Sequence, residues 1–399
     1  MKPELAAYIY PWDLARGGAG AVLDELGELG FTQLNLTANY HAISSLSPRG
    51  EDTRLFMVPR GGVFFPARAE RYGRVRPVVW PEREITDAWA VGAATAVERG
   101  FAVNAWTIGM FQPWMAQDYP YTARVFFTGD RADTGICPNS PDVQEYYAAF
   151  AADLADQIPV RRFILEGYGI PDWNYGWVRP RVLADVSPVG RAMLRLCFCG
   201  SCSALAADVG LDTERVHRTA KKVFGQYGFR NGTAGPSADE VLAGDPELLA
   251  YSLLGSAGAT RVVREMAAAL RRGGNASGLL VPVDGPEPDA NAPDLAAVRD
   301  VVSGINVWTA VMPADRQRSY LPRLRESAPE LELSLVIGPP LAAGSAVTLV
   351  TPSFNYSDPV FLDRIETARQ LNPTEIAVYH YGLLDQAAFR RTVDCITQS

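Results

Sequence analysis

The chain has 399 residues, of which 48% are hydrophobic and 21% charged, with 35 Gly and 29 Pro; this is the composition of a folded globular protein and excludes a collagenous, coiled-coil or disordered chain. The 45 Asp and Glu residues outnumber the 37 Lys and Arg residues, giving a formal net charge of −8, and no basic stripe favours a nucleic acid or an anionic membrane as partner. No apolar run reaches the roughly 20 residues that a membrane-spanning helix needs.

The first residues predict a core strand rather than a secretory signal. A signal needs a basic start, an apolar stretch of about 7–15 residues and a small-residue cleavage site. Here the first five residues lead directly into the strand-like run Ala6–Asp13. The 5 Cys are an odd number with three of them bunched, which is not typical of a secreted disulfide framework. We therefore expect a cytoplasmic protein.

Eight short apolar runs alternate with longer helical patterns along the chain. The predicted strands are Ala6–Asp13, Thr32–Thr37, Ala102–Thr107, Arg162–Glu166, Gly278–Asp284, Ile305–Val311, Leu331–Ile337 and Glu375–Tyr381. Helical patterns include Gly20–Leu29, Ile85–Glu98, Pro141–Gln157, Asp294–Val302, Asp358–Gln370 and Gln386–Ile396. Repeated strand-then-helix units form parallel sheets, and eight of them predict one α/β domain over residues 1–399, a closed (β/α)8 TIM barrel. An open doubly wound sheet is the alternative.

Two connections are much longer than an ordinary strand-to-helix loop. Residues 40–84 follow the second predicted strand, and residues 167–276 follow the fourth. Both insertions leave the carboxyl ends of their strands, which is the face where TIM barrels build active sites. We expect them to form a substrate-binding superstructure on that face.

Several common catalytic motifs are absent or incomplete. The glycine-rich turn at Gly18 and Gly20 has Leu23 where a dinucleotide fingerprint needs a third glycine, and no acidic residue ends the second strand. No Gly-x-Ser-x-Gly nucleophile elbow occurs. Three histidines are too few for a site built from several histidine ligands. We expect no organic cofactor.

Two carboxylates end consecutive apolar strands. Glu166 closes the fourth predicted strand and Asp284 the fifth. Adjacent strands lie about 4.8 Å apart, so the two carboxyls are expected roughly 5–9 Å apart, the range used in glycoside hydrolysis. A partly buried pair of like charges separates the two pKa values, which leaves one carboxyl protonated and the other ionised. In the alternative interpretation each carboxylate caps a helix or pairs with an Arg at the rim.

Aromatic and polar side chains near the strand ends favour a sugar-sized ligand. Aromatic faces stack on pyranose rings while their polar edges form hydrogen bonds. Asp13 is a reserve for the carboxylate pair, and His41 and His380 follow the second and eighth strands, where they can hydrogen-bond hydroxyls or donate protons. The candidate substrate-binding residues are Asp13, His41, Trp106, Trp173, Tyr175, Trp308 and His380.

Cys197, Cys199 and Cys202 place three thiols within one short segment. In a reducing compartment such a cluster is usually a metal site. A tetrahedral Zn²⁺ needs a fourth ligand, and Cys137 lies in the loop after the third strand, on the same face of the barrel. This predicts a closed, structural zinc site. An Asp or His217 as fourth ligand, and four free buried thiols, are the alternatives.

With these residues in place, the sequence resembles a bacterial family of uncharacterised glycoside hydrolase-like proteins. The motifs that carry the resemblance are Asn39–Ala42, Ser47–Arg49, Ala105–Thr107, Cys137–Val143, Leu165–Glu166, Leu196–Cys202 and Tyr379–Gly382. They span most of the chain, and the Cys-Pro-Asn and Cys-Phe-Cys motifs are the most specific. The resemblance implies a sugar-cleaving TIM barrel with its acidic residue at Glu166.

The chain departs from one common pattern of retaining barrels, which carry Asn before the strand-4 Glu and a Glu nucleophile on strand 7. Here Leu165 precedes Glu166, and the seventh strand ends Val336-Ile337-Gly338-Pro339 without a carboxylate. That arrangement of catalytic residues therefore cannot be assumed for this chain.

The leading hypothesis is a glycosidase that cleaves a small glycoside or oligosaccharide. Glu166 and Asp284 would be its acid/base and its nucleophile or base, in unassigned order. The alternatives are a non-hydrolytic carbohydrate- or metabolite-transforming barrel (a lyase, isomerase or biosynthetic tailoring enzyme) and a catalytically inactive sugar-binding protein. We expect no nucleic-acid or membrane partner, and a homo-oligomer is left open.

Overall fold

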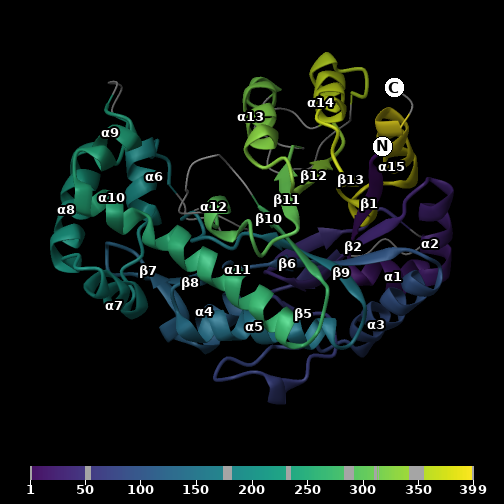
Figure 1. Ribbon diagram of the computed structural model, residues 1–399, viewed down its shortest axis with the longest axis horizontal. Helices are drawn as coiled ribbons and strands as arrows, with labels where there is room; N and C mark the ends of the chain where they lie inside the picture. Colours follow the sequence, from purple (N-terminus) through teal and green to yellow (C-terminus); the bar gives the residue numbers. More distant parts are fainter. Residues whose placement is uncertain are drawn as a thin grey trace.

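The computed structural model describes residues 2–49, 55–173, 182–230, 235–282, 292–309, 312, 314–340 and 355–397. Its centre is a closed barrel of parallel strands (Figure 1). The barrel strands are β1 (Glu4–Ile9), β2 (Gln33–Tyr40), β6 (Ala102–Ile108), β9 (Val160–Glu166), β10 (Gly278–Pro282), β11 (Gly304–Trp308), β12 (Glu332–Ile337) and β13 (Glu375–Val378). Each pairs with the next along the chain, and β13 pairs with β1. This closure confirms the predicted TIM barrel and excludes the open sheet.

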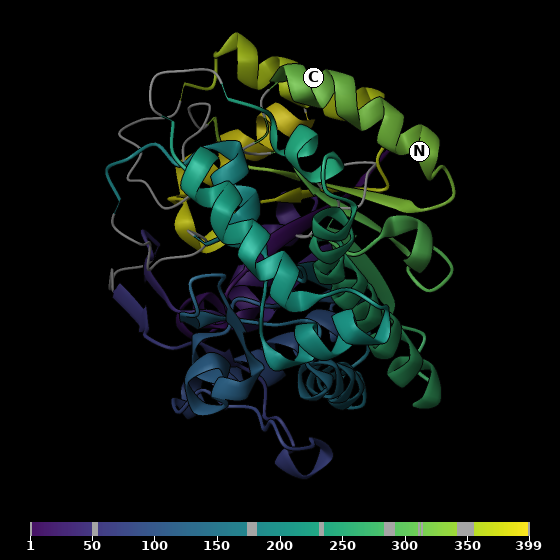
Figure 2. The same cartoon turned by 90° about the vertical axis from the view of Figure 1, so that its left-hand side faces the viewer.

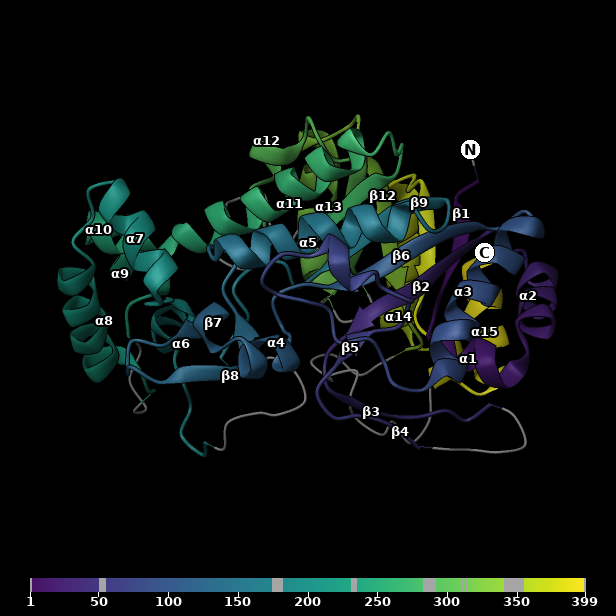
Figure 3. The same cartoon turned by 90° about the horizontal axis from the view of Figure 1, so that it is seen from below.

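A helix follows each barrel strand and packs on the outside of the sheet (Figure 3). These helices are α2 (Ala19–Glu28), α3 (Arg83–Glu98), α5 (Pro141–Ala155), α11 (Leu254–Arg272), α12 (Leu295–Val298), α13 (Ala314–Ser327), α14 (Pro359–Gln370) and α15 (Gln386–Thr397). The start of α14 shows ordinary capping chemistry. At α14, the Asp358 carboxylate accepts the backbone N–H of Val360, and Pro359 occupies the first helical position, where its missing N–H costs nothing.

The predicted ends of four strands are wrong. The second strand continues to Tyr40, three residues beyond the predicted end at Thr37. The first strand ends at Ile9 because Pro11 begins a short helix, α1 (Pro11–Gly17), so that Asp13 lies on a helix. The sixth strand ends at Trp308, and the eighth ends at Val378, with a 3₁₀ turn, η3 (Tyr381–Leu383), just after it.

The segments between β2 and α3 and between β6 and α5 add small strands and helices near the barrel mouth. The first contains the hairpin β3 (Ile43–Leu46) and β4 (Leu55–Val58), the short strand β5 (Gly62–Val63), which pairs antiparallel with β2, and the 3₁₀ turn η1 (Ala69–Arg71). The second contains α4 (Pro113–Asp118), η2 (Pro120–Thr122), β7 (Ala123–Val125) and β8 (Arg131–Ile136). In Figure 3 the hairpin lies on the opposite side of the barrel from α11.

A helical lobe is inserted between β9 and α11. Its helices are α6 (Pro188–Arg195), α7 (Gly200–Asp208), α8 (Thr213–Tyr227), α9 (Ala238–Ala243) and α10 (Pro246–Ser252). The lobe stands at one end of the molecule, towards the viewer in Figure 2. Met193, Val216 and Leu248 are among the buried residues of its own small hydrophobic core, which includes Phe127 from the loop after β7.

Within the described residues, no single helix is long and apolar enough to cross a membrane. Only the pair α6 and α7, which is bent by 90°, has the combined length and composition. Met193 on α6 and Ala206 on α7 are both buried in the core of the helical lobe.

A buried polar layer fills the bottom of the barrel, near the amino ends of the strands. Arg162 on β9 is 2% exposed and donates to Glu332 (2.6 Å), to Gln33 (2.5 Å) and to the fully buried carboxylate of Glu375. Ser334 also donates to Glu375 (2.7 Å). Because a buried charge is tolerated only when it is paired, these side chains bind four strands into one arrangement.

Candidate active site and metal centre

Glu166 lies at the opposite, carboxyl-terminal mouth of the barrel, at the last position of β9. Its side chain is half-buried, and the indole N–H of Trp106 on the neighbouring strand β6 donates to Oε2 over 2.8 Å. The register of the two strands places Ile108 beside Glu166 and Trp106 beside Ile164, so the indole reaches the carboxylate diagonally. An N–H donor stabilises the ionised form of a carboxylate. The sequence therefore correctly placed Glu166 at the mouth, and its role stays a prediction.

A ring of phenols surrounds this pair. Tyr8 packs edge-on against Trp106 with ring centroids 4.9 Å apart, and Tyr379 contacts both Tyr8 (5.6 Å) and Trp308 (4.9 Å). The hydroxyl of Tyr10 donates to that of Tyr40 over 3.3 Å. Burial, with the negative charge of Glu166 as a further cause, raises the pKa of Tyr379 to about 12. The same two causes hold the pKa of Tyr8 well above its usual range, and burial, followed by the neighbouring phenols Tyr10 and Tyr379, does so for Tyr40. These hydroxyls therefore remain hydrogen-bond donors at neutral pH.

His380 supplies a further donor at the mouth. Its Nδ1 accepts the backbone N–H of Gly382 (3.1 Å), which assigns the proton of the neutral ring to Nε2. Burial, reinforced by the charge of Arg49, holds the pKa of His380 well below its usual range, so the ring stays neutral. Nε2 is buried and has no hydrogen-bond partner among the described residues. The ring packs tilted against Tyr10, with centroids 4.0 Å apart, and its centroid lies 6.1 Å from that of Trp106. A neutral ring with its proton on Nε2 is suited to bind a hydroxyl rather than to supply a proton.

The other candidates are less directly tied to Glu166. His41 stacks on Tyr40 (4.3 Å) with Nδ1 2.6 Å from the carbonyl oxygen of Ala42, and burial lowers its pKa to about 4. Trp173 is half-buried, and its backbone N–H donates to the Asp172 carboxylate (2.9 Å). Two predicted residues, Asp284 and Tyr175, lie outside the described residues.

Asp13 lies on α1 beside the mouth, behind Tyr10. Its Oδ2 accepts the backbone N–H of Tyr10 over 2.9 Å. Burial raises its pKa to about 7, opposed by that hydrogen bond and by the positive charges of Arg49 and Arg16. Its role in binding stays a prediction. Tyr10 and Tyr40 were not among the candidates from the sequence, although the two-residue spacing of Tyr8 and Tyr10 is a signal that both face one side of an extended segment.

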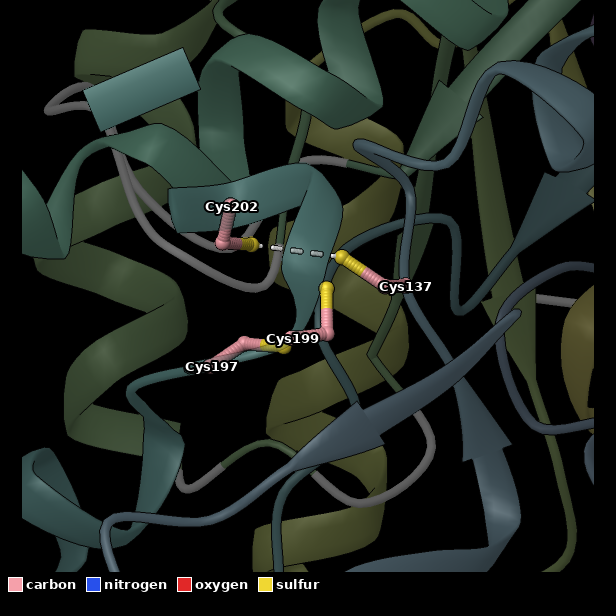
Figure 4. Close-up of side chains that lie close together, drawn as sticks. All are labelled: Cys137, Cys197, Cys199 and Cys202. Atoms are coloured by element: carbon pink, nitrogen blue, oxygen red, sulfur yellow. Dashed lines mark hydrogen bonds between the residues drawn. The ribbon is translucent and has the colours of Figure 1, made fainter. Parts of the chain in front are cut away.

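Four cysteines converge between the barrel and the helical lobe (Figure 4). Cys137 follows β8, Cys197 and Cys199 lie between α6 and α7, and Cys202 is on α7. All four are buried and free of disulfides, and their sulfurs lie within 4.8 Å of one another, with 3.4 Å between Cys137 and Cys202. Zn–S bonds of about 2.3 Å in a tetrahedron put sulfurs roughly 3.8 Å apart. The four thiols therefore have a spacing that can hold a metal ion.

The surroundings of the cluster favour a thiolate at Cys197, whereas hydrogen bonds within the cluster and burial hold the pKa values of the Cys137 and Cys202 thiols well above their usual range. Hydrogen bonds with Cys137, then with Cys199 and Cys202, and the charge of the buried Arg124 hold the pKa of the Cys197 thiol well below its usual range. The Asn139 amide donates to the sulfur of Cys202 over 3.3 Å. Metals bind thiolates rather than thiols, and hydrogen-bond donors to the sulfurs orient these ligands. His217, the alternative fourth ligand, lies elsewhere, with Nε2 2.6 Å from the carbonyl oxygen of Phe127.

No family model matches the chain, and no curated protein matches it in sequence. Solved structures share its fold. The catalytic domain of β-amylase from Paenibacillus polymyxa is 9% identical with a TM-score of 0.58, covering 99% of this chain and 98% of that one. The PgaB (BpsB) glycoside hydrolase domain from Bordetella bronchiseptica is 13% identical with a TM-score of 0.57, covering 100% and 99%.

The α-L-fucosidase isoenzyme 2 from Paenibacillus thiaminolyticus is 10% identical with a TM-score of 0.57; the match covers 99% of this chain but only 49% of the fucosidase chain, about half its length. At such identities the likeness shows the fold alone: a TIM barrel shared with glycoside hydrolases.

Proposed function

We propose that the protein is a glycoside hydrolase that cleaves a small glycoside or oligosaccharide at the barrel mouth. The observation that carries the proposal is the carboxylate of Glu166, which accepts the Trp106 indole N–H among buried phenols. Aromatic rings and hydroxyl donors of this kind suit a pyranose, and the fold is one that glycosidases use.

In the proposed reaction Glu166 is the ionised carboxylate, because Trp106 donates a hydrogen bond to it. Asp284, which ends the fifth strand predicted from the sequence, is the second carboxyl. It gives its proton to the leaving glycosidic oxygen. The bond between the anomeric carbon and that oxygen breaks. In an inverting reaction water attacks this carbon directly and gives its proton to Glu166; in a retaining reaction Glu166 first forms an ester with the carbon, and water then hydrolyses the ester while the Asp284 carboxylate takes the proton from water. A carboxyl separation of about 5–5.5 Å would give retention and about 6.5–9.5 Å inversion.

The test replaces Glu166 by Gln, which keeps the size of the side chain and removes its charge. Turnover of a panel of chromogenic aryl glycosides and reducing-sugar release from oligosaccharides should fall by about 10²–10⁴, with the thermal midpoint nearly unchanged. Glu98→Gln, on the exposed end of α3, is the matched control and should keep full turnover. Full activity in Glu166→Gln would refute the proposal.

We propose further that the four cysteines hold one structural Zn²⁺. Four thiolates fill all the positions of a tetrahedral ion, so the ion has no open position for substrate and its effect is on stability. Elemental analysis of protein purified without chelator should find about one equivalent of zinc; less than a tenth of an equivalent of any metal would contradict the assignment.

A further inference from the structure

A large hollow lies beside the mouth and does not include Glu166. It has a volume of about 840 Å³ and opens among α1, α2, the segment Ser47–Arg49 after β3, β4, the start of α3 and the turn η3. The residues that its polar chemistry depends on are Asp13, Arg16, Glu25, Arg49, Glu82 and Glu84. The proposed reaction assigns no task to this hollow.

Arg49 presents a fixed guanidinium to the hollow. Its Nε donates to the carbonyl oxygens of Tyr381 (2.7 Å) and Leu384 (3.0 Å), and Nη1 donates to Glu25 (3.0 Å). The guanidinium also lies 3.8 Å from the centre of the Tyr381 ring. Nη2 is buried and has no hydrogen-bond partner among the described residues. A buried donor without an acceptor is costly, so this nitrogen is suited to a ligand atom.

Asp13 offers the complementary group. One carboxylate oxygen accepts from Tyr10, and a carboxyl with its pKa near 7 can accept a hydrogen bond when ionised or donate one when protonated. Gly382 backs this carboxyl directly: a Cβ at that position would come within 2.0 Å of Oδ1. The absence of a side chain at position 382 is therefore required for Asp13 to lie where it does.

The charge of the lining selects the class of ligand. Four carboxylic acids, Asp13, Glu25, Glu82 and Glu84, face two guanidinium groups, one of which is already paired with Glu25. Such a lining disfavours phosphates and carboxylates. A neutral polyol suits it, because one hydroxyl can accept from Arg49 while a neighbouring hydroxyl hydrogen-bonds Asp13.

Only a thin layer separates the hollow from the proposed catalytic centre. Gly382, which contacts Asp13, donates to His380. The ring of His380 packs tilted against Tyr10 and lies 6.1 Å from Trp106, the partner of Glu166. We propose that the hollow is a second saccharide-binding site, which holds a neutral sugar unit between Arg49 and Asp13 beside the catalytic centre. The choice of a saccharide among neutral polyols rests on the proposed function.

The experiment measures binding of maltotriose, cellotriose and mannotriose to the full chain carrying Glu166→Gln, by titration calorimetry and saturation-transfer NMR. Ala15→Trp fills the hollow from its partly exposed wall on α1, and Asp13→Asn keeps the acceptor for Tyr10 while removing the charge. In that background Ala15→Trp should raise Kd at least tenfold for a sugar that binds, and Asp13→Asn roughly 3- to 10-fold. Ala243→Trp, on the exposed end of α9 in the distant helical lobe, is the matched control and should leave Kd unchanged.

Each other outcome overturns the inference. Binding that both variants leave unchanged would place the sugar elsewhere, and binding of none of the three sugars would remove the site. Tighter binding of inorganic phosphate, itself lost in Ala15→Trp, would change the ligand class to an anion. Failure of the proposed function is tested separately, by the turnover of Glu166→Gln. If Glu166→Gln kept full turnover while Ala15→Trp abolished sugar binding, the second binding site would stand and the proposed catalysis would not.

Discussion

The indole N–H of Trp106 donates to the Glu166 carboxylate and orients it. Removing this donor tests how far turnover and its pH dependence rely on that hydrogen bond. Trp106→Phe keeps an aromatic ring among Tyr8, Tyr40 and Tyr379 but deletes the donor together with one ring of the indole, a loss of volume that the control below shares. If Glu166 reacts as an ionised carboxylate, turnover should fall about 10- to 100-fold, and the acidic limb of the pH–rate profile should move to higher pH.

Trp114→Phe is the control for that experiment, because Trp114 is equally buried and loses a comparable hydrogen bond, to Gln112 (2.9 Å), away from Glu166. It should change stability and leave the pH–rate profile in place. A profile unchanged in Trp106→Phe would show that the indole does not act through Glu166.

Asp13 gives a pH dependence of stability whose sign follows from its burial. Its folded pKa of about 7 exceeds the unfolded value of about 3.9, so the folded protein holds a proton that the unfolded chain releases. The resulting stabilisation is fully present below about pH 4 and is lost as the pH rises through 7. Relative to Asp13→Asn, the wild type should lose on the order of 2–4 kcal/mol of unfolding free energy between these pH values. Urea titrations of both proteins across the range would measure it, and a constant difference would contradict the assignment.

Part of the site followed from the sequence, and the rest depended on local geometry. Glu166 and Trp106 meet because parallel strands end at the same edge, which the order of strands already implied. Tyr40 was not foreseen because β2 shifts register between Thr37 and Asn39, where it pairs with β6. A single extra residue reverses which side chains face inward afterwards, and no sequence period announces it.

At the scale of elements, the strand ends show what propensity reasoning misses. Trp12 and Tyr381 belong to the aromatic residues common in strands, yet they lie in α1 and η3. Strand propensity largely measures packing on a pleated surface, and these rings instead pack beside the barrel mouth, Trp12 on Phe56 and Tyr381 on Phe389. The alternation of strands and helices was predictable because each unit must bury its own apolar face.

The cysteine cluster connects elements that are far apart in sequence, since it joins the end of β8 to the start of the helical lobe. Cys199→Ser should remove most of the bound metal and lower the thermal midpoint by roughly 5 °C or more, as should a strong chelator added to the wild type. Cys395→Ser, a half-buried cysteine in α15 outside the cluster, is the matched control and should keep the metal. An unchanged midpoint in Cys199→Ser would contradict a structural metal.

At the scale of the whole molecule, two adjacent arginines allow the contributions of a buried and an exposed ion pair to the free energy of unfolding to be compared. Arg162 joins four strands at the barrel bottom with 2% of its side chain exposed, whereas Arg161 pairs with Glu4 with 36% and 42% of the two side chains exposed. Arg162→Met leaves the buried Glu375 carboxylate without its counter-charge and should cost about 3–5 kcal/mol of unfolding free energy. Arg161→Met should cost less than about 1 kcal/mol. Denaturant titration measures both, and equal losses would contradict this account.

The pairing of β1 with β13 has a consequence for the newly made chain. Glu4 lies beside Glu375, so one edge of the first strand finds its partner only after some 370 further residues have been added. At about 5–20 residues per second, that edge stays unpaired on the ribosome for roughly 20–70 s. An unpaired strand edge is a template for aggregation. The nascent chain therefore has a long interval in which a chaperone that covers strand edges would raise the yield of native protein.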